Sequence, residues 1–168
     1  PPEYGYFLAR TWRMHPRVAE PVSRLSYGGE LAAHPSTALR ALAGIRPGLV
    51  PIAVRHHGNA TQSPEEAKVV ADLVADLVGR AWTDIAIGED GHASVRPPRP
   101  LTQRDIIVVT PYNAQQVAVE EALAAAGFTD VPVGTVDRFQ GQEAAVAIVS
   151  LAASSGRDAP RGIEFLLL

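Results

Sequence analysis

Apolar residues recur along this chain with two different periods, and these periods predict an alternation of helices and strands. A capping box at 63–66, with a proline at the first helical position, precedes apolar residues at helical spacing: Val70, Leu73, Val74, Leu77 and Val78. We therefore expect a helix over residues 64–79, ended by Gly79. A second helix is expected to be capped by Asn113, with Gln116 at its third position, and to be closed by Gly127.

Three further apolar runs predict strands around the second helix. Residues 106–109 are all β-branched, which is typical of a strand covered on both faces of a parallel sheet, and runs at 131–136 and 144–151 follow. A strand, a helix and a strand within about thirty residues form a βαβ unit with a right-handed crossover. The pattern predicts an α/β fold with a mainly parallel central sheet.

Two segments are less regular. Residues 49–54, LVPIAV, predict a short strand, placed at a sheet edge or at a strand start because Pro51 has no N–H to donate. Residues 80–104 mix one apolar patch with Gly, Asp and Pro, and are expected to form a surface connection in which RPPRP is extended.

Composition limits the function classes. The chain has 168 residues, of which 46% are apolar and 20% charged, so a single domain over 1–168 is expected. Its net charge of −3 means that any nucleic-acid site is local. Without cysteine there is no disulfide, thiolate nucleophile or cysteine zinc site, and the cytoplasm is the expected location. No apolar run is long enough to span a bilayer. Met14 is the only methionine and the chain stops on LLL, so a fragment of a longer protein is expected.

Two polar loops follow the predicted parallel strands, TPYNAQ at 110–115 and TVDRFQGQE at 135–143. A solvated turn is the simplest interpretation of either loop. Ligands of open α/β sheets, however, bind at the carboxyl ends of the strands, where loops converge and helix N-termini present N–H donors. Because both loops lie at that edge, the pattern favours a functional role.

Three stretches together resemble successive motifs of one helicase family. They are ARTWRMHPRVAEPVSRLSYGGEL at 9–31, VVTPYNAQ at 108–115 and GTVDRFQGQEAAVAIVSL at 134–151. In this order they are similar to the second RecA-like domain of superfamily 1B helicases, which implies a three-layer α/β sandwich. The tail at 154–167 resembles the corresponding stretch of bacterial members fused to a RecB-like nuclease domain.

The resemblance implies a nucleotide site shared with the first RecA-like domain of the parent chain, which would hold most of ATP and Mg²⁺. Arg13 is expected to reach the γ-phosphate, which a planar guanidinium fork matches well. Trp12 stands where an aromatic residue stacks on the base, although core packing explains it equally well. Gly141 and Glu143 are expected to face the nucleotide, and Glu143 to accept ribose hydroxyls or to order water and Mg²⁺.

The resemblance also implies contacts to single-stranded DNA or RNA, with DNA favoured. Thr135 and Asp137 in one loop, and Thr110, Pro111, Tyr112 and Gln115 in the other, are the candidate strand-binding residues. Hydroxyl and N–H groups position a strand through its phosphates without reading sequence. Packing explains Tyr112 at least as well as stacking does, and Phe139 is expected in the core. Asp137 and Gln140 are expected to link the two sites.

Several features limit these assignments. No GxxxxGK[ST] phosphate loop occurs, so the chain alone is not expected to hydrolyse ATP. No metal ligands are predicted; His15 is expected to be structural, near the cap of a helix starting at Pro16, and the pair His56–His57 has no evident partner set. Thr11 and Ala145 depart from the family pattern, which motivates an alternative, a non-catalytic interaction domain that retains the fold. A generic phosphate-binding α/β module is a further alternative.

Overall fold

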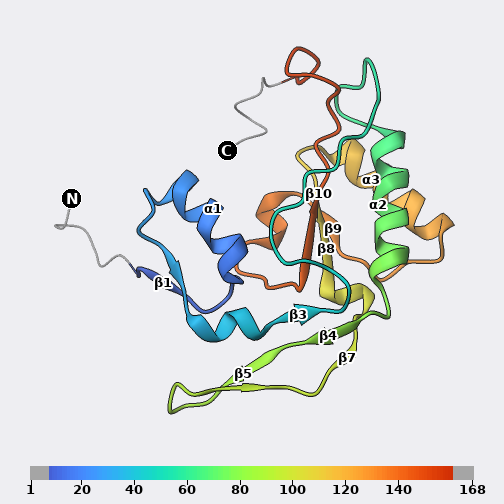
Figure 1. The fold of residues 1–168 in the computed structure, drawn as a ribbon. Helices are drawn as coiled ribbons and strands as arrows, with labels where there is room; N and C mark the ends of the chain where they lie inside the picture. Colours follow the sequence, from blue (N-terminus) through green and yellow to red (C-terminus); the bar gives the residue numbers. More distant parts are fainter. Residues whose placement is uncertain (1–7, 161–168) are drawn as a thin grey trace. The chain divides into compact units, whose positions relative to one another are not determined.

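The computed structural model describes residues 8–160 (Figure 1). Its helices and strands form an α/β fold that includes a parallel sheet, as predicted. The chain divides into two compact units, Pro1–Pro51 with Arg80–Pro100, and Ile52–Gly79 with Leu101–Leu168. We describe each unit by itself, and the single domain and the three-layer arrangement stay predictions.

The second unit contains the predicted parallel sheet. Its strands are β8 (Ile106–Val109), β9 (Val133–Gly134) and β10 (Val146–Val149), in the order β10-β8-β9, and each neighbouring pair is parallel. Val108 pairs with Val133 and with Ile148. Ile106 and Val108 are completely buried, which explains the uninterrupted β-branched run in β8. Helix α3 (Asn113–Ala125) connects β8 to β9 and completes the predicted βαβ unit.

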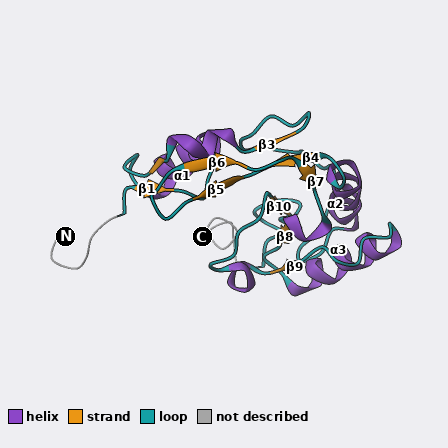
Figure 2. Cartoon of the chain, turned by 90° about the horizontal axis from the view of Figure 1, so that it is seen from below, coloured by secondary structure: helices purple, strands orange, loops and turns teal. Residues whose placement is uncertain are grey.

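Helix α2 (Pro64–Leu77) packs against α3 in the same unit, as Figures 1 and 2 show. It ends two residues before the predicted boundary, and Gly79 takes a positive φ of 88° just beyond it. The predicted capping box is only half formed. The Ser63 hydroxyl accepts the N–H of Glu66 at 3.1 Å, but the Glu66 carboxylate does not return to the Ser63 N–H, because it is bonded elsewhere in the unit.

The ends of α3 follow simple capping rules. The N-cap is Tyr112 and not Asn113, because the carbonyl of Tyr112 already accepts the N–H of Gln116. At the other end, Phe128 N–H donates to the Leu123 carbonyl and Gly127 N–H to that of Ala124. With Gly127 at φ 86°, this is a Schellman motif, so the predicted closing glycine is confirmed.

The first unit is built from short elements. Strands β1 (Arg10–Thr11) and β2 (Ala32–Ala33) pair in parallel, with helix α1 (Pro16–Ser26) between them in sequence. A 3₁₀ helix, η2 (Pro35–Leu39), leads to β3 (Ala41–Leu42). This strand joins an antiparallel sheet with β4 (Ala81–Thr83) and β7 (Arg99–Pro100), in the order β3-β4-β7. Among the described residues of this unit, the buried apolar side chains are those of Ala19, Leu42 and Ile85. Hydrophobic burial is therefore small, and polar contacts take a larger share in holding the unit together.

Two segments contain structure that differs from the sequence pattern. Residues 80–104, expected to form a surface connection with RPPRP extended, include β4 (Ala81–Thr83), β5 (Ile85–Ile87), β6 (Ala93–Val95), β7 (Arg99–Pro100) and the start of the 3₁₀ turn η3 (Gln103–Asp105). Figure 2 shows β5 and β6 side by side as a hairpin. Residues 49–54 form no strand in the described structure, where Leu49, Val50 and Ile52 are exposed and Pro51 cannot donate to a neighbour.

No helix within residues 8–160 has the length and apolar character needed to cross a bilayer.

Candidate functional site

The two loops that the sequence singles out start at neighbouring points of the parallel sheet. Thr110, directly after β8, donates its N–H to the carbonyl of Gly134, the last residue of β9, at 2.9 Å. On the other side of β8, Ser150 N–H donates to the Val109 carbonyl at 3.0 Å. The prediction that both loops lie at one sheet edge is therefore confirmed, and the segment after β10 joins them there.

In the loop 110–115 the candidate side chains turn inward. Thr110 is fully buried, and its hydroxyl donates to the Tyr112 carbonyl at 2.9 Å, which shapes the turn into α3. Pro111 and Tyr112 are half-buried. The N-terminus of α3 begins directly after this turn, so its first backbone N–H groups lie at the same edge as the loop.

Gln115 is a structural link in this conformation. Its side chain is completely buried; the amide oxygen accepts the Ser63 N–H at 2.6 Å, and Nε2 donates to Ser150 Oγ at 2.9 Å and to the Ser63 carbonyl at 3.2 Å. The amide thus joins the start of α2 to the end of β10. The structure places this predicted strand contact inside the protein, where every polar group of the amide already has a partner.

Glu66 extends the same network. One carboxylate oxygen accepts from Ser150 Oγ at 2.5 Å and from the Ala152 N–H at 3.1 Å, and the other lies 3.0 Å from His56 Nε2. His56 Nδ1 is 2.7 Å from Ser154 Oγ. The prediction that the His56–His57 pair has no partner set was wrong for His56, whose side chain is 5% exposed and bonded at both nitrogens.

Ala152 has an unusual backbone at this network. Its φ of 66° is in the left-handed region, which an alanine rarely adopts, and no other non-glycine residue of the described range does so. The hydrogen bond from its N–H to Glu66 holds the residue there. The path of the chain after β10 therefore depends on Glu66.

The loop 135–143 forms a 3₁₀ turn, η4 (Val136–Phe139), with Thr135 at its N-cap. Phe139 is buried, as predicted, whereas Asp137, Gly141 and Glu143 are exposed and Thr135 is half-buried. Gly141 has a φ of 79°, a positive value that glycine adopts without a steric cost. This loop therefore presents a hydroxyl, two carboxylates and an unhindered glycine on its surface.

Arg138 was not among the candidate residues, and its role is internal. Its Nη1 donates to the Val133 carbonyl at 2.6 Å, and its guanidinium carbon lies 5.9 Å from the centre of the Phe139 ring. Gly134 leaves room for this side chain, because a Cβ at that position would lie 2.5 Å from Arg138 Cδ and would force it to move.

Trp12 and Arg13 belong to the first unit. Trp12 is half-buried and stacks on His34, with ring centres 3.5 Å apart and planes inclined by 13°. Arg13 is exposed, and its N–H donates to Thr11 Oγ1 at 3.2 Å. The other predicted site residues lie in the second unit, so each group is described separately.

His15 has the structural role that was predicted for it. It is the N-cap of α1, and its Nδ1 accepts the Arg17 N–H at 3.1 Å. Burial lowers the pKa of His15, and the positive charge of Arg17 lowers that pKa further. A lowered pKa keeps the ring neutral near pH 7, which leaves Nδ1 able to accept the bond.

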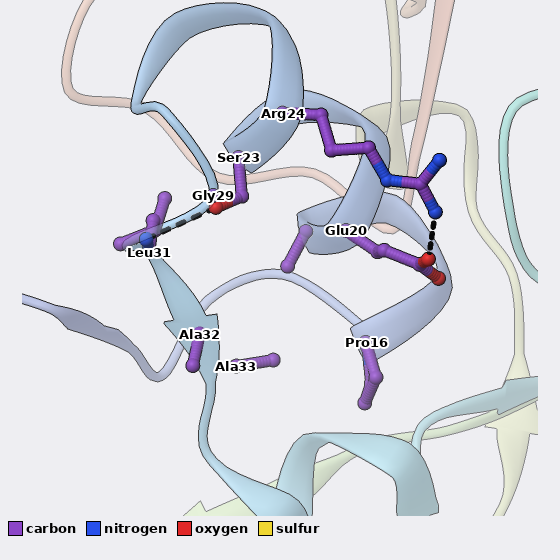
Figure 3. Close-up of a pocket in the computed structure, with 9 residues that line it drawn as sticks. Pro16, Glu20, Ser23, Arg24, Gly29, Leu31, Ala32 and Ala33 are labelled. Atoms are coloured by element: carbon purple, nitrogen blue, oxygen red, sulfur yellow. Dashed lines mark hydrogen bonds and ion pairs between the residues drawn. The ribbon is translucent and has the colours of Figure 1, made fainter.

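A shallow pocket of about 420 Å³ lies between α1 and the segment that leads into β2 (Figure 3). The Leu31 N–H donates to Ser23 Oγ at 3.0 Å across it, and Arg24 pairs with Glu20 at its rim. None of the predicted site residues lines this pocket. Within residues 8–160, no group of three or more His, Asp or Glu side chains is arranged to hold a metal ion.

The sequence matches the protein family described as "AAA domain" over residues 2–166. This chain belongs to that family.

Three helicases are similar to this AAA domain, and they support a helicase-type domain. Over 110 residues, or 66% of the chain, it is 28% identical to "DNA replication ATP-dependent helicase/nuclease JHS1" of Arabidopsis thaliana. Over 55 residues, or 33% of the chain, it is 38% identical to "RNA helicase Mov10l1" of Mus musculus. Over 55 residues it is 44% identical to "DNA polymerase alpha-associated DNA helicase A" of Schizosaccharomyces pombe.

This AAA domain spans a small part of each relative, namely 6%, 5% and 8% of their lengths. The helicase-type relatives imply nucleotide and nucleic-acid binding by proteins of this kind. Residues 161–167, part of the tail that resembles nuclease-fused helicases, lie outside the described residues.

Proposed function

We propose that this AAA domain is the second RecA-like domain of a superfamily 1B helicase, an ATP-driven motor on single-stranded nucleic acid. The observation that carries the proposal is the bond from Thr110 N–H to the Gly134 carbonyl, which brings the starts of two motif loops together at the carboxyl edge of a parallel sheet. In a helicase-type AAA domain this edge is suited to hold a ligand. The first RecA-like domain of the same parent chain is its required partner.

The nucleotide half of the proposal rests on the donor set. Arg13 offers an exposed guanidinium for the γ-phosphate, and Trp12 an aromatic ring for the base. Gly141 has nothing within 4 Å of a would-be Cβ, so a ligand can approach its backbone, and the exposed Glu143 carboxylate can accept hydrogen bonds from ribose hydroxyls. Each of these groups, taken by itself, suits one part of ATP. Mg²⁺, which would be held mainly by the first RecA-like domain, would neutralise phosphate charge. Arg13 and Glu143 are the proposed catalytic residues.

The nucleic-acid half rests on the exposed part of the same edge. Thr135 is the N-cap of η4 and Asp137 lies within it, and the first N–H groups of α3 follow Tyr112. These are donors and acceptors that position phosphates and sugars without reading bases. We favour DNA as the bound strand because two of the three relatives carry DNA and helicase in their names. We also propose a RecB-like nuclease domain in the parent chain, because one relative is named as a helicase/nuclease.

One observation favours the alternative, a non-catalytic interaction domain that retains this fold. The Thr110 and Gln115 side chains, both expected at the strand, are completely buried and bonded internally. Thr11 and Ala145 already depart from the family pattern. If the remaining site residues were also without function, the same fold would serve only to bind a partner.

Steady-state ATP hydrolysis by the full-length parent, with and without single-stranded DNA, tests the proposal. We expect DNA to stimulate the wild type, and Arg13→Ala to lose on the order of 10³-fold in turnover while still binding ATP. Arg46→Ala, which removes an exposed arginine of the same unit, is the matched control and should retain activity. A wild type that neither DNA nor RNA stimulates would favour the interaction domain.

Two further measurements separate the halves of the proposal. The isolated chain should be silent in an ATPase assay, because it lacks a phosphate loop; turnover that Glu143→Ala abolishes would contradict this. In the parent, Thr135→Ala should weaken single-strand binding and spare nucleotide binding. Thr129→Ala, which removes an exposed threonine hydroxyl of the same unit, is its control, and equal affinities of the two variants would count against the strand contact.

A further inference from the structure

Arg40 is bonded to the backbone of the Trp12–Arg13 pair. One nitrogen, Nη1, donates to the Trp12 carbonyl at 2.9 Å and to the Arg13 carbonyl at 2.7 Å. The side chain of Arg40 is only 17% exposed. A partly buried guanidinium that bridges two consecutive carbonyls fixes the peptide between them, so it restricts the direction in which the Arg13 side chain leaves the backbone.

The Arg40 side chain is itself held from the other side by Asp84. Its Nε donates to Asp84 Oδ1 at 2.8 Å, and the Ile85 N–H donates to the same oxygen at 2.8 Å. Burial raises the pKa of the Asp84 carboxyl, but the bonds from Arg40 and Ile85 outweigh burial, and the net result is a lowered pKa. Asp84 is therefore ionised near neutral pH and pairs with Arg40 as a charged acceptor.

The same short segment contacts Trp12 a second time. His34, the N-cap of η2, stacks on the Trp12 ring, and Arg40 is the C-cap of the same turn. The His34 ring is oriented by Ser36, whose hydroxyl lies 2.7 Å from Nδ1. Residues 34–40 thus hold the Trp12–Arg13 pair at two places, at the indole ring and at the two carbonyls.

We propose that Arg40 and Asp84 are positioning residues that aim Arg13 at its phosphate ligand. This inference rests on the proposed function, because it assigns the aim of an arginine whose ligand role is itself proposed. Asp84 comes from the 80–100 part of the first unit, whose strands the sequence pattern did not indicate. The role of that part is then to orient Arg13 through Arg40, without touching the nucleotide.

Removing Arg40 or Asp84 should slow ATP hydrolysis considerably, although neither side chain is proposed to contact the substrate. A displacement of about 1 Å at a catalytic group, caused from a distance, can cost on the order of 10²-fold in rate. We therefore expect Arg40→Ala in the full-length parent to lower kcat for DNA-stimulated ATP hydrolysis by about 10-fold or more, with a much smaller change in KM for ATP. Arg80→Ala removes an arginine that donates to the Ala43 carbonyl of the same unit at 3.2 Å, and this matched control should stay near wild type.

A double-variant cycle distinguishes positioning from a general loss of structure. If Arg40 acts through Arg13, Arg40→Ala should cost nothing further in an Arg13→Ala background, whereas independent effects multiply. Multiplicative losses would overturn the inference. Asp84→Asn keeps an oxygen for Arg40 Nε and should lose less activity than Asp84→Leu. Thermal unfolding of each variant identifies any that fail to fold, and Asp84→Asn, the mildest change, then provides the test.

The outcomes also separate this inference from the proposed function. If Arg13→Ala leaves DNA-stimulated turnover unchanged, the proposed ligand role of Arg13 fails. If Arg13→Ala abolishes turnover while Arg40→Ala and Asp84→Leu leave it unchanged, the proposed function stands and the positioning role is refuted. Loss of kcat in all three, without a further loss in the double variant, supports both.

Discussion

Replacing Gln115 by methionine tests whether its buried amide is a structural link. Methionine has a similar length but cannot bond to Ser63 or Ser150, so the change removes contacts at 2.6, 2.9 and 3.2 Å and inserts little extra volume. Ser63 is itself fully buried, so its N–H would be left without an acceptor. Because Gln115 also carries a predicted role in strand binding, the two interpretations make different predictions for one variant.

The magnitude follows from these contacts. Each lost hydrogen bond is worth about 1 kcal/mol, and a buried donor left unsatisfied costs about 1–3 kcal/mol. The 3.2 Å contact contributes least, so we expect a loss of about 3 kcal/mol in the free energy of unfolding. For a chain of this size that corresponds to a fall in Tm of roughly 6–12 °C.

Chemical and thermal unfolding of the wild type and the variant measure this loss. Gln116→Met is the matched control, because the neighbouring amide bonds only to Glu120 on the exposed face of α3; it should cost less than about 0.5 kcal/mol. Single-strand affinity is measured on the same proteins. A Gln115→Met protein as stable as the control but weaker in DNA binding would refute the structural interpretation and restore the predicted strand contact.

Three further predictions follow from other contacts. Gly134→Ala should cost about 1 kcal/mol or more, because its Cβ would meet Arg138 Cδ at 2.5 Å; unfolding measurements should show a smaller cost in an Arg138→Ala background, where only the 3.3 Å contact with the Cβ at position 138 is kept. Asp84, with its lowered pKa, should contribute stability at neutral pH that is lost as pH falls below about 4. The free energy of unfolding of the wild type should therefore exceed that of Asp84→Asn at pH 7 by more than it does in acid. A difference that stays constant with pH would contradict the ion pair. Glu66→Ala should destabilise by about 2–4 kcal/mol and increase hydrogen exchange at the Ala152 N–H, since three donors lose their acceptor, whereas Glu65→Ala should have the smaller effect.

Sequence periodicity predicted the elements that bury apolar side chains. The β-branched run of β8 follows from burial of a strand on both faces. The helical spacing of apolar residues in α2 follows from burial of a helix on one face. The short strands β4 to β7 were missed because two or three residues are too few to show a period. Exposure explains the strand wrongly predicted at 49–54, since an apolar run predicts a strand only when a sheet covers it.

The site was predicted less completely than the fold, and the reason is distance along the chain. Local geometry, such as the closure of α3 by Gly127, can be inferred from neighbouring residues. The Gln115 bond to Ser63 spans 52 positions and the Arg40 bond to Asp84 spans 44, and no local pattern marks either pair. A polar residue at a loop was therefore interpreted as a ligand contact when its partner was a distant part of the same protein.

The attachment of Trp12 and Arg13 to residues 34–40 has a consequence for conformational entropy. A dipeptide bound at one point can still rotate about that point, but the stack on His34 and the bonds to Arg40 remove the rotation. Backbone freedom worth about 1–2 kcal/mol per residue is then lost when the protein folds and not when a ligand arrives. A phosphate-bearing ligand that binds here needs to order only the Arg13 side chain. Its binding free energy is more favourable by the backbone entropy that folding has already removed.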